Sequence, residues 1–155
     1  MALALRYRFQ EAKAAFFRDD LLAKIGKAKF RALSKFGAYV RTRSRTSLRY
    51  KQGTAPAGKP PYSHSGLLRD FIYFAYDEST GSVVIGPVVL NGGSAQALES
   101  LEYGGPSILR RFRHGKYEEI ATQTGEHPFM RPAYQEELDR GSLEKVFDNA
   151  MEKVN

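Results

Sequence analysis

Two short runs rich in β-branched and aromatic residues, separated by a polar turn, constrain this chain more than any other segment. Residues 71–76 read Phe-Ile-Tyr-Phe-Ala-Tyr and residues 82–87 read Ser-Val-Val-Ile-Gly-Pro, with Asp-Glu-Ser-Thr-Gly between them. Strand-forming runs joined by a short polar segment that ends in Gly are typical of an antiparallel hairpin. We therefore expect a hairpin here, at the centre of an antiparallel sheet.

A long helix is expected before this hairpin. Apolar residues recur near the 3.6-residue period along residues 9–40, with Lys and Arg on the opposite face. Gly is a poor helix former, so the pattern predicts either one long helix or two that join near Gly26 or Gly37.

The chain after the first hairpin mixes helix and strand. A short helix capped by Ser94 is expected over residues 94–103, followed by a second hairpin whose turn places His114 and Gly115 at positive φ. A final helix begins near Pro132 and breaks at Gly141-Ser142, where Ser142 is expected to cap the continuation. The predicted fold is α+β: an antiparallel sheet built on hairpins, packed by a long N-terminal helix, a short middle helix and a C-terminal helix.

Length and composition fit one domain. The 155 residues divide into a basic helix and arm (1–51), a loop rich in Pro and Gly (52–61), and a sheet with the last helix (62–155). The first helix cannot bury its apolar stripe alone, so the loop is not a domain boundary. There is no Cys, which excludes disulfides and thiolate metal sites. Charges interrupt residues 1–18, so neither a signal peptide nor a membrane partner is expected.

Charge is distributed unevenly along the chain. Residues 1–59 hold 15 Lys and Arg against 3 Asp and Glu, a net charge of +12. Residues 60–155 hold 9 against 14, a net charge of −5. Such asymmetry indicates a nucleic acid or an acidic protein as partner. It also permits head-to-tail contacts between identical copies, the kind of contact that closes a ring.

The most basic segment, residues 41–51, is the one stretch with functional character. It reads Arg-Thr-Arg-Ser-Arg-Thr-Ser-Leu-Arg-Tyr-Lys and forms either the end of the first helix or an exposed arm. Its cations could follow a phosphate backbone or meet a protein surface. The cations expected to contact a neighbouring subunit, a partner or DNA are Arg41, Arg43, Arg45, Arg49, Lys51 and Lys59.

No pattern in the sequence predicts catalysis or a cofactor. His64, His114 and His127 lack the spacing of metal ligands. The Gly-Gly-Ser at residues 92–94 lacks the lysine of a P-loop and the spacing of a dinucleotide-binding turn. A small hydrolase that uses His64 or His127 with a Glu is an alternative supported only by the presence of those residues. We expect no enzyme and no cofactor.

Three segments stand in a characteristic order. Residues 58–69 read Gly-Lys-Pro-Pro-Tyr-Ser-His-Ser-Gly-Leu-Leu-Arg, residues 98–105 read Leu-Glu-Ser-Leu-Glu-Tyr-Gly-Gly, and residues 127–133 read His-Pro-Phe-Met-Arg-Pro-Ala. With the Val-Ile-Gly-Pro at residues 84–87, this arrangement resembles the tail-completion, or virion-morphogenesis, proteins of tailed bacteriophages. Gly105 and His127 depart from that pattern, in which Thr and Arg are usual. The residues that carry the motifs are Pro60, Pro61, Gly66, Leu67, Gly86, Pro87, Glu102, Tyr103, Gly104, Pro128, Phe129, Arg131 and Pro132.

The resemblance implies a structural protein of the virion, assembled in the host cytoplasm and located at the neck or tail end. Such a subunit works in a ring, commonly a hexamer. Its partners are further copies of itself, the tail terminator or tail tube protein, and the head completion or connector protein, with genomic DNA in the lumen as a further candidate. The motif residues would be packing devices. The alternative is a basic nucleic-acid-binding protein that contacts DNA through residues 41–51.

Overall fold

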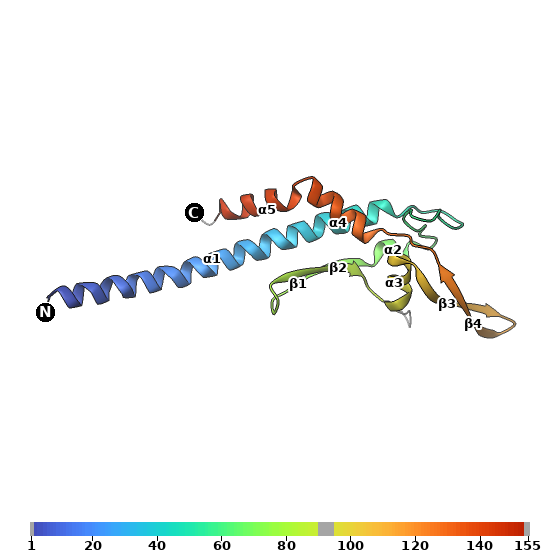
Figure 1. The fold of residues 1–155 in the computed structure, drawn as a ribbon, viewed down its shortest axis with the longest axis horizontal. Coiled ribbons are helices and arrows are strands. Elements are labelled where there is room, and N and C mark those ends of the chain that lie inside the picture. Colours follow the sequence, from blue (N-terminus) through green and yellow to red (C-terminus); the bar gives the residue numbers. More distant parts are fainter. Residues whose placement is uncertain (1, 90–94, 154–155) are drawn as a thin grey trace.

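A single helix of 46 residues, α1 (Ala2–Ser47), runs along the molecule in this computed structural model (Figure 1). The structure describes residues 2–89 and 95–153, without the side chains of residues 2–16, 95–96 and 109–111. Gly26 and Gly37 both lie inside the helix, so neither divides it. The helix also takes in residues 41–47 of the basic segment, which therefore ends a helix and does not form a separate arm.

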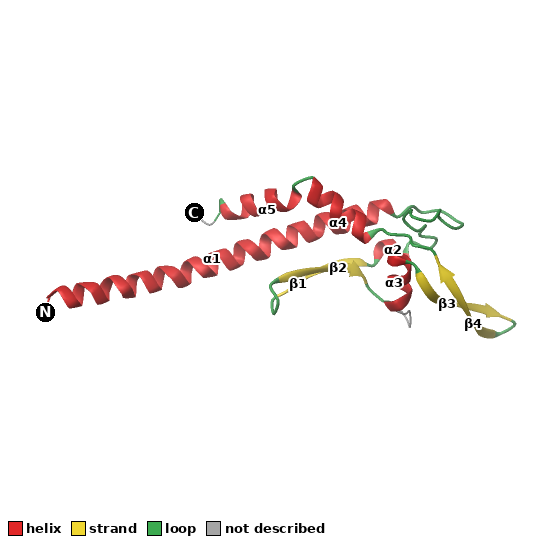
Figure 2. Cartoon of the chain, in the orientation of Figure 1, coloured by secondary structure: helices red, strands yellow, loops and turns green. Residues whose placement is uncertain are grey.

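The other elements are short and mix helix with strand, which confirms the predicted α+β fold (Figure 2). Two helices and two hairpins alternate after α1, and two helices end the described chain. In order they are α2 (Leu67–Asp70), β1 (Ile72–Asp77), β2 (Ser82–Pro87), α3 (Ala95–Tyr103), β3 (Gly105–Arg113), β4 (Lys116–Thr124), α4 (Met130–Asp139) and α5 (Ser142–Met151).

Both predicted hairpins form, but they do not join. Strand β1 pairs with β2 and β3 pairs with β4, each antiparallel, and within the described residues these are two separate two-stranded sheets. The first hairpin is therefore not the centre of a larger sheet. The second has the predicted turn, with His114 at φ 49° and Gly115 at φ 76°. Two successive positive φ values match the twist of the flanking strands.

The ends of the helices follow the sequence in part. Gly104 ends α3 at φ 74°, and Gly141 breaks the C-terminal helix at φ 65°, both as predicted. The expected cap Ser94 lies outside the described residues. The prediction that Ser142 caps α5 is wrong: Gly141 occupies the cap position, and the Ser142 hydroxyl instead donates to Glu137 Oε2 at 2.7 Å.

The main core lies where α4 and α5 pack on α1, with α5 running back along it (Figure 1). Small residues of α1, Ala28 and Ala32, allow the helices to approach closely, and Phe36 and Val40 fill the space beside them. Partners from α4 and α5 are Ala133, Val146 and Ala150. A second, smaller cluster joins Leu48, Ile72 and Phe129.

Hairpin β1–β2 lies against α1 at Gly37. A Cβ at this position would come within 2.9 Å of Val83 Cγ2 and 3.0 Å of Phe74 Cδ2, both on stiff side chains of the hairpin. At Gly26 a Cβ would meet nothing within 4 Å. The two glycines in α1 therefore have different effects. Gly26 only weakens the helix, whereas Gly37 allows the helix and the hairpin to come into contact.

Replacing each glycine by alanine should change stability in opposite directions. Gly26→Ala should raise the free energy of unfolding by up to about 1 kcal/mol, because alanine is the better helix former. Gly37→Ala should lower it by roughly 1–3 kcal/mol, because the added methyl group overpacks the hairpin contact. Urea unfolding followed by circular dichroism measures both, and equal stabilisation by the two changes would contradict the packing described for Gly37.

Candidate interaction site

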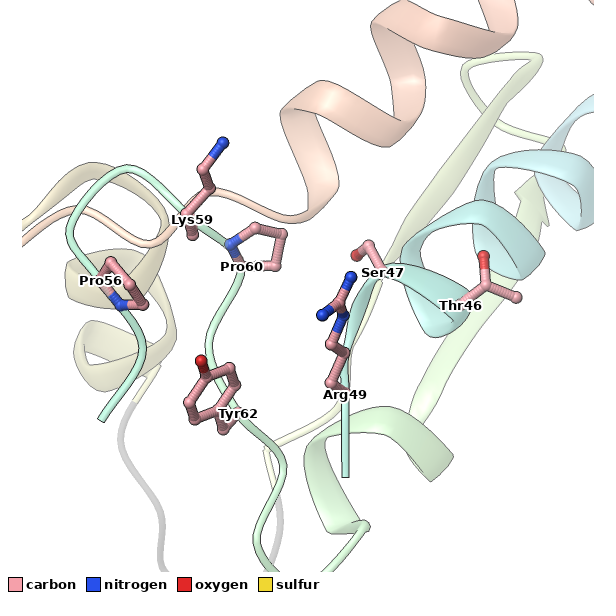
Figure 3. A pocket seen from close by; sticks show the side chains of 7 residues that line it. All are labelled: Thr46, Ser47, Arg49, Pro56, Lys59, Pro60 and Tyr62. Carbon is pink, nitrogen blue, oxygen red and sulfur yellow. The ribbon is translucent and has the colours of Figure 1, made fainter. Parts of the chain in front are cut away.

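A cleft separates the C-terminal end of α1 from the Pro- and Gly-rich loop (Figure 3). Its volume is about 440 Å³. Arg49 stands on the side of the helix end and Lys59 on the side of the loop (Figure 3). Its lining residues are Thr46, Ser47, Arg49, Pro56, Lys59, Pro60 and Tyr62.

Backbone hydrogen bonds hold the loop side of the cleft in place. The Gly58 N–H donates to the Glu126 carbonyl at 2.9 Å, and His127 Nδ1 donates to the Lys59 carbonyl, also at 2.9 Å. His127 is only 8% exposed, so this histidine positions the loop. On the other side, the Ser63 N–H donates to the Arg49 carbonyl at 2.9 Å. The two cations of the cleft are thus carried by backbone that the rest of the chain fixes.

The cleft is suited to an anionic group. Within the described residues, neither Arg49 nor Lys59 forms an ion pair with a carboxylate. Lys51 lies next to them, with its Nζ 5.2 Å from the centroid of the Tyr62 ring. Two unpaired cations beside hydroxyl groups and proline rings favour a carboxylate from a protein surface or a phosphate.

The other three arginines of the basic segment make contacts within the chain. Arg41 Nε donates to the Ile72 carbonyl at 2.6 Å and links α1 to β1. Arg45 pairs with Asp70 of α2 at 3.0 Å. Arg43 pairs with Glu137 at 3.1 Å and with Glu136 at 3.3 Å, both on α4. The structure therefore places Arg49 and Lys59 at the same cleft and Lys51 against the Tyr62 ring that lines it, while Arg41, Arg43 and Arg45 join α1 to its neighbours.

Glu137 is the buried member of this contact, with 6% of its surface exposed. Burial by itself raises the pKa of the Glu137 carboxyl. The hydrogen bonds from Ser142 and Arg43, together with the charge of Arg43, lower the pKa by more than burial raises it, so the pKa is below its ordinary value. No local pattern in the sequence indicates this pair, because Arg43 and Glu137 are far apart along the chain.

Removing the Arg43 charge should cost stability mainly at neutral pH. A lowered pKa means that ionised Glu137 stabilises the fold above its ordinary pKa, and that this contribution is lost as the pH falls through the lowered folded value. Arg43→Gln should therefore reduce the free energy of unfolding by roughly 1–3 kcal/mol at pH 7. The difference from the unmodified protein should shrink in urea unfolding below about pH 4.

Arg45→Gln is the matched control, because its partner Asp70 is 61% exposed. An exposed pair contributes about 0–1 kcal/mol, so this change should have a small effect with little dependence on pH. Equal losses for the two variants at every pH would contradict the role given to Glu137.

The motif residue Glu102 connects α3 to the start of α4. Its carboxylate is buried and accepts three backbone N–H groups, from Phe129 at 3.0 Å, Met130 at 3.1 Å and Arg131 at 2.7 Å. These N–H groups have no partner within the helix, and the positive end of the helix dipole also favours a negative charge there. A glutamate from another helix thus performs the function of a helix cap, which joins residues 98–105 to residues 127–133.

The remaining motif residues mostly shape the backbone or fill the interior. Pro61, Pro128 and Phe129 are buried, and Phe129 belongs to the second core cluster. Gly66 starts α2 at φ 82°, whereas Leu67 beside it is 53% exposed. The others lie at the cleft (Pro60), in the end of β2 (Gly86 and Pro87), at the end of α3 (Tyr103 and Gly104) and in the first turn of α4 (Arg131 and Pro132). Arg131 lies over the Tyr103 ring, 5.7 Å from its centroid.

Glu102→Ala should destabilise the protein strongly. The change leaves one buried and two partly buried N–H groups without an acceptor, so the free energy of unfolding should fall by about 3 kcal/mol or more in urea unfolding. Glu99→Ala on the same helix removes an exposed carboxylate and should change it by under about 0.5 kcal/mol. A similar small loss at both positions would show that the cap does not matter for the fold.

The described residues hold no group of three or more His, Asp or Glu placed to bind a metal ion. None of the helices in that part of the chain combines the length and the apolar character needed to cross a membrane. Comparison with protein families, with curated proteins and with solved structures finds no match for this chain.

Proposed function

We propose that this protein is a structural subunit of a phage neck, which associates with copies of itself in a ring between the tail and the head connector. The observation that carries the proposal is an apolar stripe on α1 that the described chain leaves uncovered. The resemblance of residues 58–69, 98–105 and 127–133 to tail-completion proteins supports the place of such a ring in the virion.

The uncovered stripe continues the buried one. Residues 28, 32, 36 and 40 of α1 face α4 and α5, and at 3.6 residues per turn the same face continues toward the N-terminus through Leu21, Leu22 and Ile25. These three side chains are 51%, 55% and 38% exposed, because the helix extends past the end of α5 (Figure 1). Phe17 lies further along and is 71% exposed. A row of large apolar side chains of this kind marks an interaction surface.

A second copy of the chain is the occupant that fits. The stretch around the stripe is basic, with Lys24, Lys27, Lys29, Arg31 and Lys35. Residues 60–155 carry a net charge of −5, with 9 Lys and Arg against 14 Asp and Glu, so the acidic part of one copy complements the basic helix of the next. The two surfaces differ, and a contact between unlike surfaces repeats around a ring.

The cleft supplies a second positively charged surface for a contact between subunits. Arg49 and Lys59 are held by ordered backbone and lack a carboxylate partner in the described residues, so they suit an acidic side chain of the neighbouring subunit. Together, the helix and the cleft give the basic region two points of attachment, one apolar and one ionic. The three internal arginines then serve the subunit's own fold.

Charge placed in the uncovered stripe should abolish self-association without unfolding the chain. The double variant Leu22→Lys/Ile25→Lys should remain monomeric at concentrations where the unmodified protein forms rings, as measured by mass photometry and negative-stain electron microscopy. Ala23→Lys adds a like charge at an exposed position on the opposite side of the same helix and should still assemble.

Circular dichroism shows whether each variant keeps its helix. A folded stripe variant that assembles as well as Ala23→Lys would contradict the role of the stripe. A purified protein that stays monomeric up to high concentration, and does not cap isolated tails, would contradict the function itself.

A further inference from the structure

Hairpin β3–β4 extends away from α1 and the core (Figure 1). Every residue of β4 from Lys116 to Gln123 is exposed, and only Thr124 is partly covered. A two-stranded hairpin without such cover is at best marginally stable in water. So exposed a ribbon suggests that its surface contacts something other than the chain's own core.

The charges on this hairpin are matched along its length but not at its tip. The ladder pairs Arg110 with Glu119 and Arg111 with Glu118, so each of these register positions combines residues of unlike charge. The last pair before the turn is Arg113 opposite Lys116. Residues 110–117 contain four Lys and Arg and no Asp or Glu, and like charges directly opposite each other destabilise a hairpin. An anion between Arg113 and Lys116 would remove that cost.

An aromatic pair braces the tip. The rings of Phe112 and Tyr117 lie across the ladder from each other with centroids 5.0 Å apart, although the residues are 62% and 75% exposed. Such cross-strand pairs stabilise a hairpin by about 0.2–1 kcal/mol. With the tight turn at His114-Gly115, they constrain the backbone that carries the two cations at the end of the ribbon.

We propose that this tip binds the phosphate backbone of duplex DNA. Two adjacent cations gain most from a dense line of negative charge, and duplex DNA carries one charge per about 1.7 Å of its axis, twice that of one strand. A two-stranded ribbon also fits the width of the major groove. The contact is independent of the proposed ring: a single folded chain presents the complete tip.

This surface suits DNA better than the basic segment at residues 41–51 does. There, Arg41, Arg43 and Arg45 are occupied by the chain's own groups, which leaves only Arg49 and Lys51. Arg113 and Lys116 also form no ion pair within the described residues, and they stand directly opposite each other at the end of an exposed ribbon. A second copy is a poorer partner for the tip, because an Arg–Glu pair interrupts the apolar residues on the face that carries Ile108 and the aromatic pair.

Fluorescence anisotropy with a labelled duplex, titrated over a range of salt concentrations, tests the proposal. In Arg113→Ala/Lys116→Ala the affinity at low salt should fall about tenfold or more. The slope of log Kobs against log salt should flatten by about 2, roughly 1 for each phosphate-binding cation that is removed. Arg113→Lys keeps the charge and should keep most of the binding.

The matched control is Arg69→Ala/Lys153→Ala, which removes two exposed cations, one from α2 and one from the residues after α5. Its slope should stay near that of the unmodified protein. Equal reductions in DNA affinity for the two double variants would show that binding depends only on the net charge of the protein, and would overturn the proposal. Absence of binding by the unmodified protein, or tighter binding to a single strand of the same length, would overturn it too.

Two further measurements separate this contact from self-association. The folded monomeric variant Leu22→Lys/Ile25→Lys should still bind duplex DNA, so failure of the ring leaves the tip's binding measurable. If Arg113→Ala/Lys116→Ala prevents ring formation and leaves DNA binding unchanged, the tip is a subunit interface and the proposal is wrong.

Discussion

Helix α1 is longer than the elements that cover it, and the organisation of the molecule depends on this mismatch. Isolated helices are marginal in water, and in proteins most of their stability comes from packing an apolar face. Residues 28–40 obtain that packing from α4 and α5, but the same face continues through Leu21, Leu22 and Ile25, which the described chain leaves exposed. A chain built in this way leaves part of its longest helix for a neighbour to complete.

The covered part of α1 is anchored from several directions, which explains why the rest can extend freely. Arg41 joins it to β1, Arg43 to α4 and Arg45 to α2. The start of α4 is in turn held by the buried carboxylate of Glu102. The motif residues Glu102 and Phe129 therefore belong to this framework. The surfaces left for partners, the uncovered stripe, the cleft and the hairpin tip, lie around it.

Local signals in the sequence were sufficient for the elements. Runs of β-branched and aromatic residues around a polar turn predicted the first hairpin, His114-Gly115 predicted the tight turn of the second, and Gly141 predicted the break between α4 and α5. Each of these depends on residues a few positions apart. The sequence left open whether Gly37 ends a helix. The need for glycine at this position comes from a contact with Val83 and Phe74, which exists only in the folded chain.

The same local signals could not predict contacts between residues that are far apart in the sequence. The cap of α4 comes from Glu102, 27 residues before Phe129. The basic segment read as one group of cations, yet the carboxylate that pairs with Arg43 is 94 residues away in the sequence. The two hairpins were expected to share a sheet, and nothing in their strands shows that they stay apart. Which cations remain available to a partner is therefore a property of the fold.

Hydrogen–deuterium exchange of the α1 backbone tests most directly whether a neighbour completes this helix. In dilute monomer, amides of residues 2–25 should exchange quickly, while those of residues 28–47 are protected by the core. When the protein is concentrated enough to assemble, residues 2–25 should gain strong protection and residues 28–47 should change little. Equal, rapid exchange of residues 2–25 in both conditions would contradict the idea that α1 is completed by a second copy.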